Sequence, residues 1–385
     1  MKAQVPKVGP VTVFVNELRL TARQWLLVGG IVLAFVLLAP WVWKQAERFE
    51  TGSDYRLPYA LSKDYWLYER RLGELPANSA VVIGDSVVWG EYVLPDGTLS
   101  HFLNEAAGQP EAFVNAGVNG LFPLALEGLV EHYGGALHHR KVILHCNLLW
   151  MSSPKADLQT TKEERFNHAR LVPQFSPRIP CYRADASERL SVIVERNLSV
   201  LAWVNHLQIV SFNQKSVPDW TLEQGTGEPP GHPNTYKNPL AQLTLRVPVA
   251  PEFDPERGPA SARHKPWSTT GEGSTRFDWV TLESSLQWAA FRRLTRLLRE
   301  RGNDVLVVVG PFNEHLMAEE NRAAYRQLRD GVAAWLKDNQ IAAVVPEPLA
   351  SPLYADASHP LTEGYRVLAE RLRGDAAFQG WLAKR

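Results

Sequence analysis

Two short stretches far apart in the chain carry the residue types of a serine nucleophile site. The stretch AVVIGDSVVWGE, residues 80–91, places Ser86 directly after a run of small and β-branched apolar residues. A serine hydroxyl becomes a nucleophile when a histidine accepts its proton and a carboxylate orients that histidine. Near the other end of the chain, Asp356 stands three residues before His359, so the carboxylate can reach Nδ1 within one turn and leave Nε2 for Ser86. These residues predict acyl transfer through a serine.

An acyl-transfer site also needs donors for the oxyanion that forms on the attacked carbonyl, each worth on the order of 3 kcal/mol. We predict three donors: the backbone N–H of Ser86, the backbone N–H of Gly117 and the side-chain amide of Asn147. Gly117 suits this role because the absence of a Cβ lets the backbone approach a substrate.

Each of these residues also has an ordinary structural interpretation. Ser86 could cap the helix that follows it, and Asp356 could cap a turn. Gly117 and Asn147 are common turn residues, and His359 could be a surface histidine. Their joint placement, at the ends of predicted strands and just before the last long helix, favours the catalytic interpretation.

A second group of polar residues, Asn313, Glu314 and His315, ends the run VVVGPFNEH. These side chains could bind a sugar hydroxyl or act as a second acid/base pair, or they could form a hydrogen-bonded loop. The eleven histidines include no HExxH motif and no Cys/His cluster. No metal ion or cofactor is therefore expected.

The elements that must position these residues alternate between strands and helices. Apolar runs predict strands at Ala80–Gly84, Ala112–Asn115, Lys141–Cys146, Asp304–Val309 and Ile341–Val345. Helical spacing predicts helices at Leu99–Ala107, Pro123–His132, Leu282–Glu300, Glu319–Asp338 and Thr362–Arg373. Short strands that are apolar on both faces, separated by amphipathic helices, predict an open α/β/α sandwich with a parallel sheet of about five strands. Ligands of such sheets lie outside the carboxyl ends of the strands, where the candidate residues fall.

The N-terminal region predicts a membrane anchor. Residues 25–43, WLLVGGIVLAFVLLAPWVW, contain no charge over 19 residues, which is long enough to cross a hydrocarbon core of ~30 Å. A cleaved signal peptide and a buried helix are the alternatives, but proline and tryptophan fill the region where a cleavage site would need small residues. More basic residues precede the span than follow it, so we expect residues 1–24 in the cytoplasm and the rest outside.

The remaining chain divides into a juxtamembrane segment, 44–78, and an α/β domain, 79–385, that contains an insertion at 151–278. The insertion includes a predicted helix at Ala186–Leu207, and nine prolines lie between Pro229 and Pro266. Such a segment either covers or extends a site, or is a disordered loop. Cys146 and Cys181 match no metal spacing, and we expect free buried thiols, although a disulfide between them stays open. With 41 basic and 41 acidic residues, nothing in the net charge points to nucleic acid.

Four blocks of this sequence resemble the SGNH, or GDSL-type, hydrolase superfamily. They are GDSVVWG with Ser86, NAGVNG with Gly117, LHCNLLW with Asn147, and DASHP with Asp356 and His359. The resemblance covers nearly residues 80–373, with the blocks in the family's order. It implies Ser86 as nucleophile, His359 as base, Asp356 as its orienting acid, and Ser86, Gly117 and Asn147 as the oxyanion hole. The third block departs from the family's Gly-x-Asn-Asp pattern, because histidine and leucine flank the asparagine here.

An anchor followed by an outward-facing domain of this kind is similar to the cell-envelope branch of that superfamily. The resemblance implies a periplasmic or extracellular serine esterase or O-acyltransferase that acts on small acyl esters, acetyl above all, of an envelope carbohydrate. Two alternatives stay open: a non-catalytic glycan-binding module, and an accessory subunit that receives acyl groups from a multi-span membrane acyltransferase. The sequence is compatible with both hydrolysis and transfer. It specifies neither the polymer nor the oligomeric state.

Overall fold

The computed structural model describes residues 20–49, 51–52, 54–222, 237–247, 266–267 and 272–384. The chain divides into two compact units, Met1–Gln45 and Ala46–Arg385. Helix α1, Ala22–Ala46, accounts for nearly all of the described part of the first unit. The predicted span 25–43 lies inside this helix.

Helix α1 is long and apolar enough to cross a membrane. Its 25 residues extend over about 37 Å at the rise of an α-helix. Large apolar side chains are exposed along it, among them Trp25, Leu26, Leu37 and Trp41. A signal sequence near an N-terminus has the same length and composition, so the helix by itself is compatible with either role.

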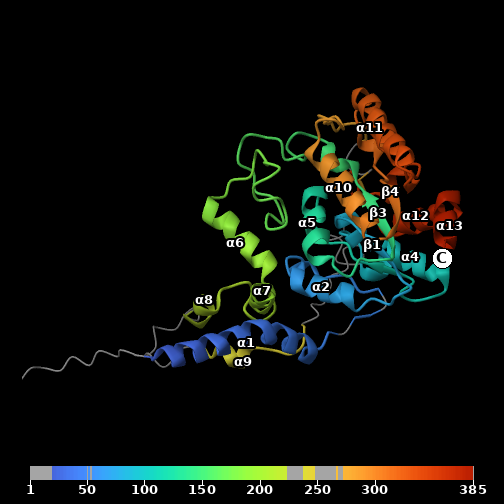
Figure 1. The fold of residues 1–385 in the computed structure, drawn as a ribbon. Coiled ribbons are helices and arrows are strands. Elements are labelled where there is room, and N and C mark those ends of the chain that lie inside the picture. The colour runs from blue at the N-terminus through green and yellow to red at the C-terminus, as the bar shows by residue number, and fades with distance from the viewer. Residues whose placement is uncertain are drawn as a thin grey trace, which may run out of the picture. The chain divides into compact units, whose positions relative to one another are not determined.

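A five-stranded parallel sheet forms the centre of the second unit, in the order β2-β1-β3-β4-β5 (Figure 1). The strands are β1 Ala80–Ile83, β2 Phe113–Asn115, β3 Lys141–Cys146, β4 Asp304–Val309 and β5 Ala342–Val344. Each lies within its predicted range, and the predicted α/β class with about five parallel strands is confirmed. Strand β2 lies on one side of β1, whereas β3, β4 and β5 follow in order on its other side. The direction in which strands are added therefore reverses between β1 and β3. In open α/β sheets, that reversal places a crevice at the carboxyl ends of β1 and β3.

Helices cover both faces of the sheet (Figure 1). One face carries α2 Tyr65–Gly73, α5 Pro123–Tyr133, α10 Leu286–Glu300 and α11 Glu319–Asp338. The other carries α3 Ser86–Trp89, α4 Leu99–Ala107, α12 Thr362–Gly374 and α13 Ala376–Ala383. Successive strand residues alternate between the two cores: Val81 and Ile83 pack on the first face and Val82 on the second. Both faces are buried, which explains why the strands are continuous apolar runs.

The helices follow their predicted ranges closely, with one informative shift. Helices α4 and α11 have the predicted bounds, and α5 and α12 end one residue later. Helix α10 begins at Leu286 rather than Leu282, because Ser285 caps it by accepting the N–H of Trp288. Helices α2, α3 and α13 were not predicted. They are short and lack a long amphipathic repeat.

The insertion contains four helices in its described parts: α6 Ala186–Asn197, α7 Ser199–Ser211, α8 Val217–Leu222 and α9 Pro239–Gln242. The predicted helix 186–207 is therefore two helices, interrupted at Leu198, whose backbone is extended with φ −117° and ψ 103°. The first part of the insertion contributes to the main core through Leu158, Leu171, Val172 and Ile179. Both cysteines are free and buried, as expected.

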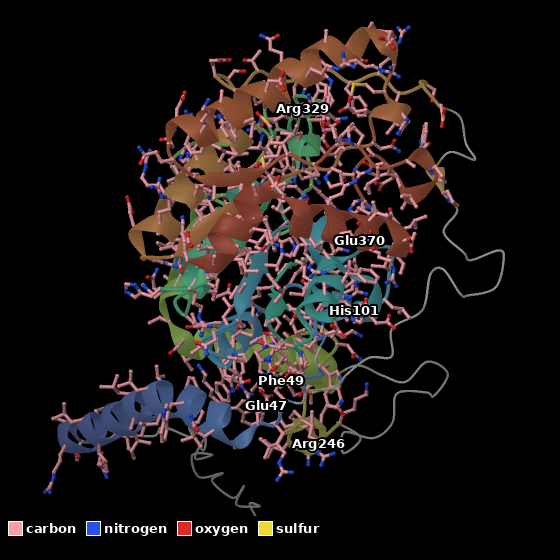
Figure 2. All side chains as sticks on the ribbon, turned by 90° about the vertical axis from the view of Figure 1, so that its right-hand side faces the viewer. Glu47, Phe49, His101, Arg246, Arg329 and Glu370 are labelled. Atoms are coloured by element: carbon pink, nitrogen blue, oxygen red, sulfur yellow. The ribbon has the colours of Figure 1, made fainter. Side chains whose placement is uncertain are left out.

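A later part of the insertion pairs with the segment that follows α1. The Arg48 N–H donates to Leu245 O, and the Val247 N–H donates to Arg48 O. The labels of Phe49 and Arg246 in Figure 2 show where the two segments meet. Val247 packs with Leu57, Leu61 and Leu67 in a small separate apolar cluster. These described parts are thus packed against the body, whereas most of the proline-rich stretch lies outside the described residues.

Candidate functional site

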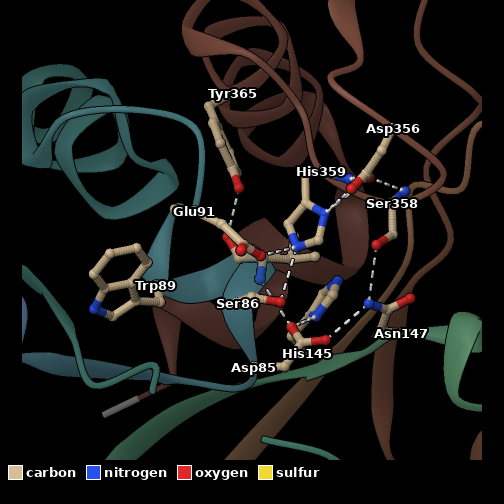
Figure 3. A network of polar contacts seen from close by, with 12 residues as sticks. Asp85, Ser86, Trp89, Glu91, His145, Asn147, Asp356, Ser358, His359 and Tyr365 are labelled. Carbon is tan, nitrogen blue, oxygen red and sulfur yellow. Dashed lines mark hydrogen bonds and ion pairs between the residues drawn. The ribbon is translucent and has the colours of Figure 1, made fainter. Parts of the chain in front are cut away.

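Ser86 is the first residue of α3, directly beyond the carboxyl end of β1. The cap of this helix is Asp85, whose Oδ1 accepts the N–H of Val87 at 3.0 Å. The alternative that Ser86 caps the helix is therefore wrong. Its hydroxyl instead faces His359, which lies in the loop before α12 (Figure 3).

Asp356 and His359 lie in the loop before α12, and the turn holds both side chains in place. One carboxylate oxygen of Asp356 accepts the backbone N–H groups of Ser358 and His359 at 2.9 and 3.0 Å. Both carboxylate oxygens lie 2.8 Å from His359 Nδ1. Because a carboxylate only accepts, Nδ1 carries the proton and Nε2 accepts from the Ser86 hydroxyl at 2.8 Å. The structure thus joins the three predicted residues in one hydrogen-bonded chain (Figure 3).

The charges around His359 change its protonation. Burial would lower the pKa of His359, but the hydrogen bond and charge of Asp356, with the charges of Asp85 and Glu91, outweigh burial and raise it above 6.5. Burial would raise the pKa of Asp356, but the hydrogen bond and charge of His359 and two backbone N–H groups lower it. The pair therefore favours an ionised carboxylate beside an imidazole whose pKa is raised.

A second buried network lies beneath Ser86, and the sequence analysis did not identify its role. Asp85 Oδ1 is 3.2 Å from His145 Nδ1, and Asp85 Oδ2 accepts the Asn147 amide at 2.8 Å. His145 Nε2 lies 3.1 Å from Gly310 O. Both ring nitrogens of His145 therefore face oxygen atoms of the protein. Burial would raise the pKa of Asp85, but the hydrogen bonds of His145 and Asn147 and the charges of His145 and His359 lower it.

The residues of this network follow neighbouring strands, and that signal was present in the sequence. Asp85 follows β1 and His145 stands near the end of β3, so both lie at the sheet edge where ligands bind. His145 occupies one of the positions at which the sequence departs from the SGNH pattern. In the structure, the His145 imidazole at this position is buried against Asp85.

The three predicted oxyanion donors have different surroundings. The Gly117 N–H donates to Asn115 Oδ1 at 3.0 Å. The Asn147 amide nitrogen donates to Asp85 and, at 3.3 Å, to Ser358 Oγ, and its oxygen accepts the Leu149 N–H. Within the described part of the chain, only the Ser86 N–H of the three has no hydrogen-bond acceptor.

Gly117 lies against α3, and its lack of a side chain is required there. A Cβ at Gly117 would lie 2.5 Å from Trp89 N and 2.8 Å from a Val88 methyl carbon. The glycine therefore lets the loop after β2 pack against α3. This close packing accounts for glycine at the position without any reference to a substrate.

The residues Asn313, Glu314 and His315 have partners within the protein. The buried Asn313 amide donates to Asp356 O at 3.1 Å, and its backbone N–H donates to Ala357 O. Glu314 pairs with Arg329 at 3.2 Å, and His315 Nε2 lies 2.9 Å from Leu349 O. Asn313 therefore supports the turn that holds Asp356, while Glu314 and His315 bond to other loops and helices.

Glu91 and Tyr92, which the sequence analysis did not single out, lie beside the imidazole. Glu91 Oε2 is 3.3 Å from His359 Nε2. The Tyr92 ring meets the imidazole edge to face, with ring centroids 5.2 Å apart. Both residues belong to the loop after α3, five and six residues beyond Ser86. No simple motif marks them, because their importance depends on how this loop folds back.

Arg56 holds that loop in place from the segment that precedes α2. Its guanidinium is buried and lies 4.0 Å from the centre of the Trp89 ring. It donates to the carbonyls of Trp89, Gly90 and Val93. Gly90, with φ +87°, ends α3 in the left-handed conformation that favours glycine.

A cavity of about 320 Å³ lies between the start of α2 and two parts of the insertion, residues 166–170 and helix α7. Its lining combines two cations, two aromatic rings and three amides: Lys63, Arg170, Tyr65, Phe166, Asn205, Gln208 and Gln214. His168 in its wall is 2.8 Å from Asn119 O, two residues beyond Gly117. Burial lowers the pKa of His168 to about 4, so its neutral ring donates to Asn119 and accepts from Tyr65. The cavity therefore adjoins the Gly117 loop, although Ser86 does not line it.

Comparison with known proteins adds no family name to this geometry, because no protein-family model and no curated protein matches the chain. Within the described residues, no group of three or more His, Cys, Asp and Glu side chains is arranged to hold a metal ion.

Proposed function

We propose that this protein is an SGNH-type serine esterase or O-acyltransferase that acts on small acyl esters, acetyl above all, of a cell-envelope carbohydrate. The observation that carries this proposal is the hydrogen-bonded chain from Ser86 Oγ through His359 to Asp356, at the carboxyl edge of a parallel sheet. The order of the four SGNH-like blocks supports the same reading. Helix α1 would anchor the catalytic unit outside the cytoplasm.

The proposed reaction begins when His359 Nε2 removes the proton from Ser86 and the serine oxygen attacks the acyl carbon. Asp356 keeps the proton of the imidazole on Nδ1 and stabilises the imidazolium. The imidazolium then protonates the leaving alcohol, which leaves an acyl ester on Ser86. Water or a sugar hydroxyl resolves this ester by the reverse sequence of proton transfers.

The carbohydrate part of the proposal is supported by the cavity next to the Gly117 loop. Amide side chains and a hydroxyl match the donors and acceptors of sugar hydroxyls, and Phe166 offers an apolar face. Lys63 would favour a sugar that carries an acidic group, whereas Arg170 already pairs with Glu195 at 2.8 Å.

A non-catalytic glycan-binding or accessory role is the second candidate. It is favoured by the partners that the Gly117 N–H and the Asn147 amide already have. Both groups would have to exchange those partners for a substrate oxyanion.

The test is ester cleavage by the full-length chain in detergent, with para-nitrophenyl acetate as substrate. Ser86→Ala is expected to reduce turnover by roughly 10⁴-fold or more, because the nucleophile is lost. Ser191→Ala, on the exposed surface of α6, is the matched control and should retain full activity. Equal turnover by Ser86→Ala and the unmodified protein would refute the serine mechanism, and absence of turnover in both would favour the non-catalytic role.

A further inference from the structure

Glu91 presents a carboxylate to the same ring nitrogen that faces the nucleophile. Its Oε2 is 3.3 Å from His359 Nε2, and that nitrogen is 2.8 Å from Ser86 Oγ (Figure 3). The Glu91 side chain is 35% exposed, so the carboxylate is open to solvent on one side. Among the residues that the structure describes, His359 is the one basic side chain that pairs with Glu91.

The position of Glu91 is set by its backbone. The Glu91 N–H donates to Ser86 O at 3.1 Å, which ties the residue directly to the nucleophile. Arg56 binds the carbonyls of Gly90 and Val93 on either side of it. The carboxylate is therefore carried on a loop that cannot move far without breaking buried hydrogen bonds.

We propose that Glu91 is an acceptor-binding residue, which makes the acyl-enzyme prefer acceptors with two hydrogen-bond donors. Such acceptors are water and the neighbouring hydroxyls of a sugar, and simple monoalcohols are disfavoured. This inference rests on the proposed acyl transfer through Ser86, and it names the class of acceptor for that site.

To resolve the acyl ester, the acceptor hydroxyl gives its proton to His359 Nε2, and its oxygen forms a new bond to the acyl carbon. The bond from that carbon to Ser86 Oγ breaks, and Nε2 returns the proton to Ser86. A hydroxyl placed to reach Nε2 is also beside Glu91, since 3.3 Å separates that nitrogen from the carboxylate.

The second donor decides which acceptors fit. Water has a second O–H, and a diol has a neighbouring hydroxyl, so both can donate to Glu91 while the first proton faces Nε2. A monoalcohol instead turns its alkyl group toward the carboxylate. A carboxylate that loses one bound water without gaining another donor is disfavoured.

The experiment measures how the acyl-enzyme partitions between two small alcohols. Full-length protein in detergent is supplied with para-nitrophenyl acetate and equal concentrations of ethylene glycol and ethanol, and the two acetate esters are quantified. We expect glycol to be favoured by roughly tenfold per hydroxyl, as for a hydrogen bond to a charged group. Glu91→Gln should reduce this preference to about threefold or less. Glu91→Asp, which keeps the charge but withdraws it by one methylene, should fall between.

Glu370→Gln is the matched control, because Glu370 is an exposed carboxylate on α12 (Figure 2). It should keep the preference of the unmodified protein. An unchanged glycol preference in Glu91→Gln, or no preference in the unmodified protein, would overturn the role of Glu91. Either result would leave the proposed function standing if Ser86→Ala has lost ester cleavage, whereas undiminished cleavage by Ser86→Ala would remove the proposed function itself.

Discussion

At the scale of single residues, the charge around His359 is the feature with the clearest consequence. Asp356 bonds to one side of the ring, Glu91 lies beside the other, and Asp85 lies beneath. Three carboxylates near one imidazole favour its protonated form. In the proposed reaction, a protonated imidazole cannot accept the Ser86 proton, so these carboxylates would set the pH above which Ser86 reacts.

The pH dependence of ester cleavage tests this arrangement. His359 must be neutral to accept the Ser86 proton, so kcat/KM should rise with pH through the raised pKa of His359. Its half-maximum should therefore lie above pH 6.5, the ordinary value. The measurement is kcat/KM for para-nitrophenyl acetate between about pH 5 and 9.

The variant Asp356→Asn, which lacks the orienting carboxylate, is the comparison for this pH profile. In Asp356→Asn, the His359 pKa should fall, because the largest contribution that raises it is lost. The acid limb should move to lower pH, and kcat should drop by roughly 10⁴-fold. An acid limb at or below pH 6.5 in the unmodified protein would contradict this account.

At the scale of elements, the loop after α3 is held by a residue from outside the sheet. Arg56 precedes α2, yet it satisfies three carbonyls at and beyond the end of α3. Helix α3 has only four residues and provides few hydrogen bonds of its own. The placement of Ser86 and Glu91 thus depends on a contact between the segment that follows α1 and the first strand-to-helix turn.

Arg56→Lys tests that dependence. Lysine keeps the charge but cannot reproduce the planar fork, so carbonyls that Arg56 satisfies lose their donors. We expect the free energy of unfolding to fall by about 2–4 kcal/mol and kcat for ester cleavage to fall with it. Chemical denaturation and the acetate assay give the two quantities. Arg246→Lys, at an exposed arginine, should change neither, and similar behaviour of both variants would show that the guanidinium does not hold the loop.

At the scale of the whole second unit, a buried charged cluster joins three regions of the chain. His206 of α7 lies 2.7 Å from Asp64, the cap of α2, and 2.9 Å from Glu47. Arg70 of α2 also pairs with Glu47, at 2.7 Å. Since both ring nitrogens of His206 face carboxylates, the ring is an imidazolium that links the insertion to the body.

This cluster predicts an alkaline loss of stability. Burial would lower the pKa of His206, but Asp64 and Glu47 together raise it to about 9. A pKa raised from 6.5 stabilises the fold fully below pH 6.5, and that contribution is lost as pH rises through about 9. The loss should be on the order of 3 kcal/mol in the free energy of unfolding.

The measurement is chemical denaturation from pH 6 to about 10. His206→Gln should be less stable at neutral pH, because a carboxylate loses its charged partner. Its free energy of unfolding should also show no such decrease at alkaline pH. A parallel decline in both proteins would assign the effect to other groups.

Much of the fold followed from the sequence, because its physical causes are local. Apolar runs located β1 to β5, and the spacing of apolar residues located α4, α5, α11 and α12, since burial on both sheet faces imposes these patterns. The positions of Ser86, Asp356 and His359 followed from the rule that parallel strands present ligands at their carboxyl ends. Helix α3 was not predicted because its four residues carry too little periodicity.

Unlike the local pair of Asp356 and His359, the partners of Asn147, Glu91 and Arg56 were decided only by the tertiary structure. That Asn147 is bound to Asp85 depends on segments 62 residues apart in the chain. The places of Glu91 and Arg56 likewise depend on how one loop packs against another. Periodicity in a sequence reports which face of an element is buried, whereas the partner of a polar group is set by the three-dimensional arrangement of distant segments.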